Sequence, residues 1–288
     1  MQKVRKAVIP AAGFGTRFLP ETKSVPKEMM PIVDTPALQL VVQEVVDSGI
    51  DNVLIISSSR KRCMEDHFDR CAELEYLLRK AGKTTELAMC ERIENMANFT
   101  FIRQKEMKGS GHAIALAKEF VANEPFAVLY GDDLMYSPAS PVTGQLVKAY
   151  ETTGTSILGV QRVDMNEVYK YGVIKPGAQK GRYTEVKGFV EKPPVELAPS
   201  NLVSMGRYVL TPEVFEQLEK SEFSPNGELY LTTAIERMIH TSGVYAYEFD
   251  GIRYDTGDKL GYLKATVEFA LRDEKLSKPF REYLRSLN

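Results

Sequence analysis

The chain has 288 residues, 37 basic and 39 acidic side chains, a net charge of −2 and a hydrophobic fraction of 43%. These values are typical of a globular protein with a sizeable core. The near-balanced charge argues against a general nucleic-acid-binding protein, which would normally carry a basic excess. No apolar run approaches the roughly 20 residues of a membrane helix, and the start of the chain lacks the apolar stretch of a signal peptide. We therefore expect neither a nucleic-acid partner nor a membrane partner.

The three cysteines indicate a reducing compartment. Cys63, Cys71 and Cys90 lack the spacing of a metal site, and three cysteines cannot all pair with one another. We therefore expect a cytoplasmic protein.

Strands and helices alternate in the first part of the chain. Residues 6–10 form a short apolar strand, residues 36–48 have helical apolar spacing, and residues 52–57 are a β-branched run typical of a strand buried on both faces. This order predicts a βαβ unit. Residues 61–90 are charged and carry a helical apolar stripe, which we interpret as helix with a solvated face.

The later elements continue this pattern and then change to shorter strands. Further strands are predicted at residues 99–104, 126–130, 156–162, 171–175, 186–191, 204–210 and 244–249. Helices are predicted at residues 112–121, 143–152, 229–240 and 259–271, with one more beginning at residues 211–213 and a mostly helical tail. A tight turn is expected at residues 254–259. We expect the second half of the chain to continue the sheet of the first.

A glycine-rich stretch at residues 11–31 reads AAGFGTRFLPETKSVPKEMMP and directly follows the first predicted strand. Such a turn leaves backbone N–H groups free to bind phosphate, and glycine allows the phosphate to come close. Arg17, Lys23 and Lys27 add three positive charges to the same loop. The stretch therefore predicts a site for a nucleoside triphosphate.

Two carboxylates, Asp132 and Asp133, directly follow the strand predicted at residues 126–130. Ligands of open α/β sheets bind at the carboxyl ends of the strands. We therefore expect both side chains on the same edge of the sheet as the glycine-rich stretch.

A dinucleotide-binding oxidoreductase would also begin with a βαβ unit. Its fingerprint requires a third glycine where Phe18 stands and an acidic residue where Ser57 to Ser59 stand. Both departures argue against this class.

The order GxGTRxxPxTKxxPKExxP at residues 13–31 resembles the signature of the sugar-1-phosphate nucleotidylyltransferases. Later blocks follow in the order of that family and extend the resemblance over nearly the whole chain: GDD at 131–133, VEKP at 190–193, SNLVSMGRYVL at 200–210, GELYLTTAI at 227–235 and DTGDKLGY at 255–262. The resemblance implies an α/β protein with a Rossmann-like three-layer αβα nucleotidyltransferase fold, a mixed central sheet and a C-terminal helical segment. It also implies one nucleotidyltransferase domain at residues 1–265, with a nucleotide-binding half at about 1–160 and a sugar-binding half at about 161–265, followed by a C-terminal helical oligomerisation segment at 266–288.

Within the family, the blocks most resemble the branch that joins UTP and glucose 1-phosphate. The implied reaction is attack of the sugar phosphate on the α-phosphorus of UTP, which depends on in-line positioning and charge neutralisation rather than on a protein nucleophile. By this resemblance the catalytic residues are Arg17, Lys27 and Lys192. The nucleotide-binding residues are Ala11, Ala12, Gly13, Gly15, Thr16, Glu28, Gln104 and Gly109. The sugar-binding residues are Gly172, Glu191 and Lys192.

The resemblance further implies a magnesium ion bound by Asp132 and Asp255, since a hard cation prefers carboxylate oxygens. Asp133 is a candidate to share this ion with Asp132, because two aspartates stand where the family often has one. The resemblance also implies a homodimer or homotetramer, for which the amphipathic tail offers an interface.

Two alternatives remain open for the activity. Tyr230 and Thr233 replace a glutamine and an aspartate that are typical of the uridylyltransferases, and the DTG at residues 255–257 is also found in thymidylyltransferases. One alternative is therefore a thymidylyltransferase or another sugar-1-phosphate nucleotidylyltransferase. The other is a non-catalytic regulator that binds nucleotide sugars, which would be expected to have lost a metal carboxylate or a phosphate lysine.

Overall fold

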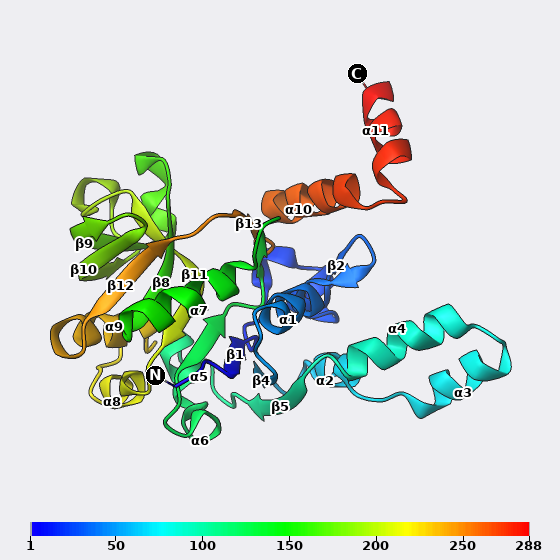
Figure 1. Cartoon of the computed structure of the whole chain (residues 1–288), viewed down its shortest axis with the longest axis horizontal. Helices are drawn as coiled ribbons and strands as arrows, with labels where there is room; N and C mark the ends of the chain where they lie inside the picture. Colours follow the sequence, from blue (N-terminus) through cyan, green and yellow to red (C-terminus); the bar gives the residue numbers. More distant parts are fainter. Residues whose placement is uncertain (1, 288) are drawn as a thin grey trace.

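The computed structural model describes residues 2–287, and its centre is a mixed sheet of nine strands (Figure 1). The strand order is β5-β4-β1-β6-β11-β8-β12-β10-β9. The strands span Lys6–Pro10 (β1), Asn52–Ser57 (β4), Asn98–Arg103 (β5), Phe126–Leu129 (β6), Ser156–Arg162 (β8), Gly172–Lys180 (β9), Tyr183–Glu191 (β10), Leu202–Leu210 (β11) and Val244–Glu248 (β12). Strands β5, β4, β1 and β6 are parallel, whereas β11 is antiparallel to β6 and β8. The second half of the chain thus continues the sheet of the first, as predicted.

Helices cover both faces of this sheet, which confirms the predicted three-layer α/β fold. One layer comprises α1 (Ala37–Asp47), α2 (Arg62–Phe68), α7 (Val142–Thr153) and α10 (Lys259–Arg272). The other comprises α5 (Ser110–Ala115), α6 (Lys118–Val121), α8 (Glu213–Glu219) and α9 (Leu231–Thr241). Alternation along β1 divides the core, because Ile9 packs with the first layer and Val8 with the second.

Two helical segments extend away from this body (Figure 1). The stretch at 61–90, predicted as one helical region, is divided into α2, α3 (Ala72–Lys80) and α4 (Thr84–Glu94), and the last two form a projecting hairpin. At the C-terminal end, α11 (Ser277–Ser286) has no buried residue and follows α10 away from the sheet. The predicted helix at 112–121 is also divided, because a tighter turn at Ala117 separates α5 from α6.

A second sheet of two strands lies beside the main one and was not predicted. It pairs β7 (Asp133–Tyr136) with β13 (Ile252–Asp255) in antiparallel register. The turn expected at residues 254–259 therefore begins inside a strand. This pairing sets Asp133 directly opposite Asp255. The glycine-rich stretch is followed by a third small sheet, formed by β2 (Pro31–Ile32) and β3 (Thr35–Pro36).

Candidate active site

The glycine-rich loop leaves β1 and runs through three short 3-10 turns, at Thr16–Phe18, Glu21–Lys23 and Lys27–Met29. It folds back on itself at Gly15, whose carbonyl accepts the Thr22 hydroxyl at 2.8 Å. Gly15 has a left-handed φ of 66°, and a Cβ there would lie 3.2 Å from Thr22 Cγ2. Glycine is therefore required at this fold-back. Gly13, Thr16 and Arg17 are exposed on the loop, where a phosphate can reach them.

Lys27 forms an ion pair with Asp132, 105 residues further along the chain. Burial opposes both charges, but each ion stabilises the other. As a result, the pKa of Lys27 is raised and the pKa of Asp132 is lowered from their ordinary values. The lysine expected to bind the triphosphate and a carboxylate expected to bind the metal therefore face each other.

Glu28 is buried beneath the loop and bound to Lys61. The Lys61 ammonium donates to Glu28 Oε2 and to the carbonyl of Ala11, both at 2.6 Å. The two side chains are only 1% and 7% exposed. Burial raises the pKa of Glu28 and lowers that of Lys61, and in each case the partner's charge opposes the shift. In this structure Glu28 and Lys61 together anchor Ala11, the first residue of the loop.

The nucleotide-binding side also includes Gln104, which was predicted as the last residue of a strand and directly follows β5 in the structure. Gln104 lines a cavity of about 590 Å³ together with Phe14 of the loop. Its amide nitrogen lies 2.8 Å from His112 Nδ1, a contact that fixes the orientation of the amide if this ring nitrogen is the acceptor. Gly109 has a φ of 91°, and a Cβ there would lie 2.5 Å from the carbonyl oxygen of Leu229. Glycine is therefore required at 109 by the neighbouring backbone.

Asp132 and Asp255 approach each other at Gly257. A Cβ on Gly257 would lie 2.5 Å from Asp132 Oδ2 and 3.1 Å from Asp255 Oδ1, so only glycine leaves this space open. Thr256 donates its backbone N–H at 2.9 Å and its hydroxyl at 2.8 Å to the carbonyl of Asp132, which ties the two segments together. The sequence placed these aspartates together only by resemblance, and the structure brings them together directly.

These two carboxylates fit a hard divalent cation, because their oxygens converge on a space that carries no side chain. Within residues 2–287 no group of three His, Cys, Asp or Glu side chains is placed to hold a metal ion. A cation bound by Asp132 and Asp255 would therefore need its remaining ligands from phosphate and water, as is usual for magnesium.

The predicted sugar-binding residues line a cavity of about 430 Å³ whose wall includes the carboxylate of Asp133. Its walls include Gly172, Glu191, Lys192, Gly109, Asp133 and Arg253. A Cβ on Gly172 would lie 2.5 Å from the ring of Phe189, so packing alone requires glycine there. The structure thus brings the predicted sugar-binding residues into one cavity, whose wall also holds Asp133 and the Arg253 side chain that contacts Asp255.

Lys192 has an unusual backbone for a residue with a side chain. Its φ is 43°, in the left-handed region, and its N–H donates to the carbonyl of Tyr171 at 2.9 Å. Such a conformation costs on the order of 1–3 kcal/mol and is concentrated at functional sites. The backbone strain and the position at the cavity both support a role for Lys192 in binding a ligand.

The family model for nucleotidyl transferases matches residues 6–271 of the chain. The chain belongs to the nucleotidyl transferase family. Among its curated relatives, the UTP–glucose-1-phosphate uridylyltransferase of Staphylococcus epidermidis is 50% identical over 288 residues, which cover 100% of both chains. The chain is also similar to two solved structures. A UTP-bound UGPase from Acinetobacter baumannii has a TM-score of 0.92 and 37% identity, over 99% of this chain and 100% of that one. A UDP-glucose pyrophosphorylase complexed with UDP-glucose has a TM-score of 0.86 and 39% identity, over 94% of this chain and 100% of that one.

Several side chains of this nucleotidyl transferase contribute to the site although the sequence did not single them out. Tyr130 and Tyr208 line the sugar-side cavity, where Ser204 donates its hydroxyl to Tyr208 at 3.0 Å. Burial raises the pKa values of both tyrosines. Lys61 and Arg253 were likewise missed, because nothing in the sequence distinguishes them from the exposed basic residues nearby.

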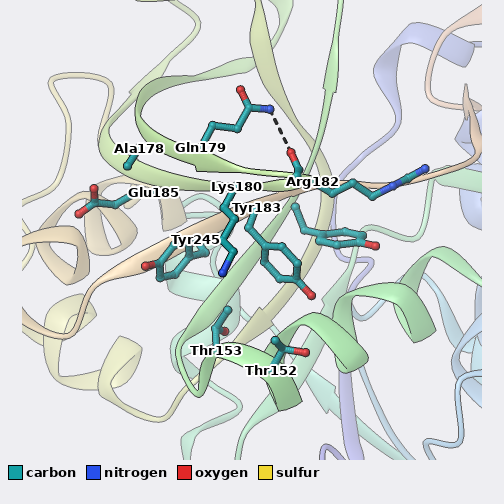
Figure 2. A pocket seen from close by; sticks show the side chains of 11 residues that line it. Thr152, Thr153, Ala178, Gln179, Lys180, Arg182, Tyr183, Glu185 and Tyr245 are labelled. Carbon is teal, nitrogen blue, oxygen red and sulfur yellow. Dashed lines mark hydrogen bonds between the residues drawn. The ribbon is translucent and has the colours of Figure 1, made fainter.

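A larger cavity of the nucleotidyl transferase, about 670 Å³, lies elsewhere (Figure 2). It is bounded by the β9–β10 hairpin and the end of α7, and Tyr183, Tyr245 and Lys180 are among its walls. It contains none of the residues that the sequence assigned to the site.

Along residues 2–287, every helix is too short or too polar to cross a membrane.

Proposed function

We propose that the protein transfers UMP from UTP to glucose 1-phosphate and releases UDP-glucose and pyrophosphate. One structural observation carries this proposal: the cavity that holds Glu191 and Lys192 also has Asp133 in its wall, and the preceding residue, Asp132, pairs with Lys27 of the glycine-rich loop, so a sugar phosphate and a triphosphate can be brought together there. The full-length similarity to a uridylyltransferase supports the choice of UTP and glucose over other substrates of the family.

In this reaction a phosphate oxygen of glucose 1-phosphate forms a bond to the α-phosphorus of UTP. The bond from the α-phosphorus to the bridging oxygen breaks, and its electron pair leaves with pyrophosphate. No bond to the protein is needed, so the protein acts by alignment and by neutralising charge as it develops.

The candidate residues divide between the two substrates. Arg17 and Lys27 bind the triphosphate, and the planar guanidinium of Arg17 suits two phosphate oxygens at once. Lys192 holds the sugar phosphate in line, and Glu191 accepts hydrogen bonds from sugar hydroxyls. The uracil base and the rest of the nucleotide lie along the loop and the end of β5, at Ala11, Ala12, Gly13, Gly15, Thr16, Gln104 and Gly109. Glu28 acts here through the loop that it anchors with Lys61.

Asp132 and Asp255 would hold the magnesium ion, which supplies positive charge against the phosphate oxygens of the nucleotide. The convergence of the two carboxylates at Gly257 supports this assignment.

We further propose a homodimer or homotetramer that forms through the C-terminal segment at residues 266–288. This proposal is supported by α11, which has no buried residue and exposes Tyr283, and by the exposed Leu287 directly after it. Light scattering at micromolar concentration is expected to give a multiple of the chain mass, and a monomer would contradict the proposal.

A cytoplasmic location agrees with the three free cysteines.

The test of the activity is a matrix of nucleotides against sugar phosphates, read by pyrophosphate release in the presence of magnesium. We expect the fastest release with UTP and glucose 1-phosphate. Faster release with dTTP would reassign the protein to the thymidylyltransferases. No release with any of the four common nucleoside triphosphates would favour a non-catalytic regulator.

A further inference from the structure

Arg253 bridges two of the carboxylates at the acidic end of the β7–β13 sheet. Its Nη2 lies 2.5 Å from Asp133 Oδ1 and 3.4 Å from Asp255 Oδ2. Arg253 and Asp255 are two residues apart on the same strand, so their side chains lie on the same face of the small sheet. Asp133 stands opposite Asp255 on the neighbouring strand. One guanidinium therefore contacts both acids across the strand pair.

The position of this guanidinium is itself restrained. The Arg253 side chain is 15% exposed. Its central carbon lies 5.3 Å from the centre of the Tyr171 ring, and Nη1 donates to the Tyr171 hydroxyl at 3.5 Å. Stacking on one side and carboxylates on the other leave the arginine little freedom.

The two carboxylate oxygens of Asp255 have different partners. Oδ2 faces Arg253, whereas Oδ1 accepts the Gly257 N–H at 3.0 Å and points toward the space shared with Asp132. Without the guanidinium, the charges of Asp132, Asp133 and Asp255 would repel one another without a neutralising cation, and the Gly257 N–H alone would restrain the rotation of Asp255.

We infer that Arg253 is a positioning residue that holds Asp255 with Oδ1 facing Asp132, ready to bind a divalent cation. The inference rests on the proposed function, since it concerns the cation of that same site. It assigns Arg253 an action through Asp255 and not a contact with the sugar phosphate, although Arg253 also lines the sugar-side cavity.

The chain offers a matched control in Arg272. Its guanidinium lies 4.1 Å from the centre of the Tyr136 ring and donates to the Tyr254 hydroxyl at 2.9 Å and to Glu268 at 2.8 Å. Arg272 is thus also stacked on a tyrosine, paired with a carboxylate and packed on the β7–β13 sheet. It contacts neither Asp133 nor Asp255, so Arg272→Met removes similar chemistry without touching the carboxylates of the site.

The test measures Mn²⁺ binding to the full-length enzyme with UTP and without sugar phosphate, by water-proton relaxation, which reports enzyme-bound Mn²⁺ without turnover. Arg253→Met is expected to weaken this binding by about tenfold or more, as is typical when a residue supporting a metal ligand is removed. The Mn²⁺ concentration for half-maximal pyrophosphate release is expected to rise in parallel. Arg272→Met is expected to leave both values within about twofold of the wild type.

Arg253→Lys covers the case in which the methionine variant does not fold. Lysine keeps the positive charge but has a single nitrogen, so it cannot bridge both acids, and we expect an intermediate loss of Mn²⁺ affinity. Wild-type affinity in the lysine variant would overturn the inference, because no bridge would then be needed.

Other outcomes would also overturn it. The first is unchanged Mn²⁺ binding in Arg253→Met together with a raised KM for glucose 1-phosphate. The second is a loss of Mn²⁺ affinity in Arg272→Met as large as that in Arg253→Met. The third is a wild-type enzyme that binds no Mn²⁺ beyond that bound by free UTP. A wild-type protein that binds Mn²⁺ but releases no pyrophosphate would remove the proposed function alone, and the binding measurement would still test Arg253.

Discussion

The two charged regions of the candidate site differ in how firmly the protein holds them. The acidic turn, residues 131–133, is supported from the core. Arg207 is fully buried and donates to the carbonyl of Asp133 at 2.5 Å and to Glu44 Oε2 at 2.8 Å. Glu44 in turn accepts the hydroxyl and the N–H of Thr143 at the start of α7. Helices α1 and α7 and strand β11 thus fix the backbone that carries the carboxylates.

The glycine-rich loop, by contrast, is anchored near its two ends and, apart from the buried Phe18, is largely exposed between them. Lys61 holds its first residue and Lys27 pairs with Asp132, whereas Arg17 and Lys23 extend into solvent. The difference follows from electrostatics. Neighbouring carboxylates repel one another and must be held in place before a cation arrives, whereas isolated cations on a loop can be ordered by the triphosphate itself.

Breaking the support of the acidic turn is expected to have the largest effect. Arg207→Met leaves Glu44 as a buried charge without its partner, which costs about 3–5 kcal/mol of folding stability. Thermal unfolding should show a clear drop in Tm, together with loss of activity as the turn loses its anchor.

The double variant Arg207→Met with Glu44→Leu is the control for this prediction. It removes both charges at once, so it should be more stable than Arg207→Met alone. If the double variant were the less stable of the two, the buried pair would not be the support that we describe.

Removing a carboxylate from the supported turn is expected to affect turnover more than folding. Asp132→Asn removes one of the two charges beside Gly257, and we expect a loss of transition-state stabilisation on the order of 3 kcal/mol, or more than about 100-fold in kcat. The Tm should fall much less than in Arg207→Met, because Lys27 loses an ion-pair partner that is partly exposed to solvent.

Asp133→Asn provides the comparison within the same turn. The carboxylate of Asp133 is bound to Arg253, whereas the oxygens of Asp132 and Asp255 converge at Gly257. Asp133→Asn should therefore reduce kcat less than Asp132→Asn does. An equal or larger reduction would make Asp133 a ligand of the cation.

Much of the fold could be predicted because its signals are local. The strands β1, β4 and β8 have the predicted bounds, since a continuous apolar run between polar flanks needs no distant partner to be recognised. The β7–β13 pair was missed because each strand has four residues and the partners are far apart in the chain. Its existence depends on tertiary packing. The turn predicted at residues 254–259 is present but shorter, at residues 256–258, directly after β13.

The residues of the candidate site could likewise be predicted only where the sequence carries a local signal. Residues that lie in a motif, such as Asp255 and Lys192, were named as candidates through the resemblance, which also implied that distant blocks converge. Lys61 and Arg207 could not be identified, because a basic side chain becomes a buried anchor only when an acid from another element packs against it. No local pattern contains that information.

The exposed middle of the loop should tolerate substitution in folding but not in binding. Arg17→Ala removes the guanidinium that we propose to bind the triphosphate, and we expect it to raise the KM for UTP by about 30-fold, or about 2 kcal/mol. Lys23→Ala, a second exposed cation on the same loop, should change the KM by less than about threefold, because a solvated charge outside direct contact contributes little. Both variants should keep the Tm within the equivalent of about 0.5 kcal/mol, since neither side chain is buried. Equal increases in the KM for UTP in the two variants would mean that the loop attracts UTP by its overall charge. The predicted difference between them requires that Arg17 contacts the phosphates directly.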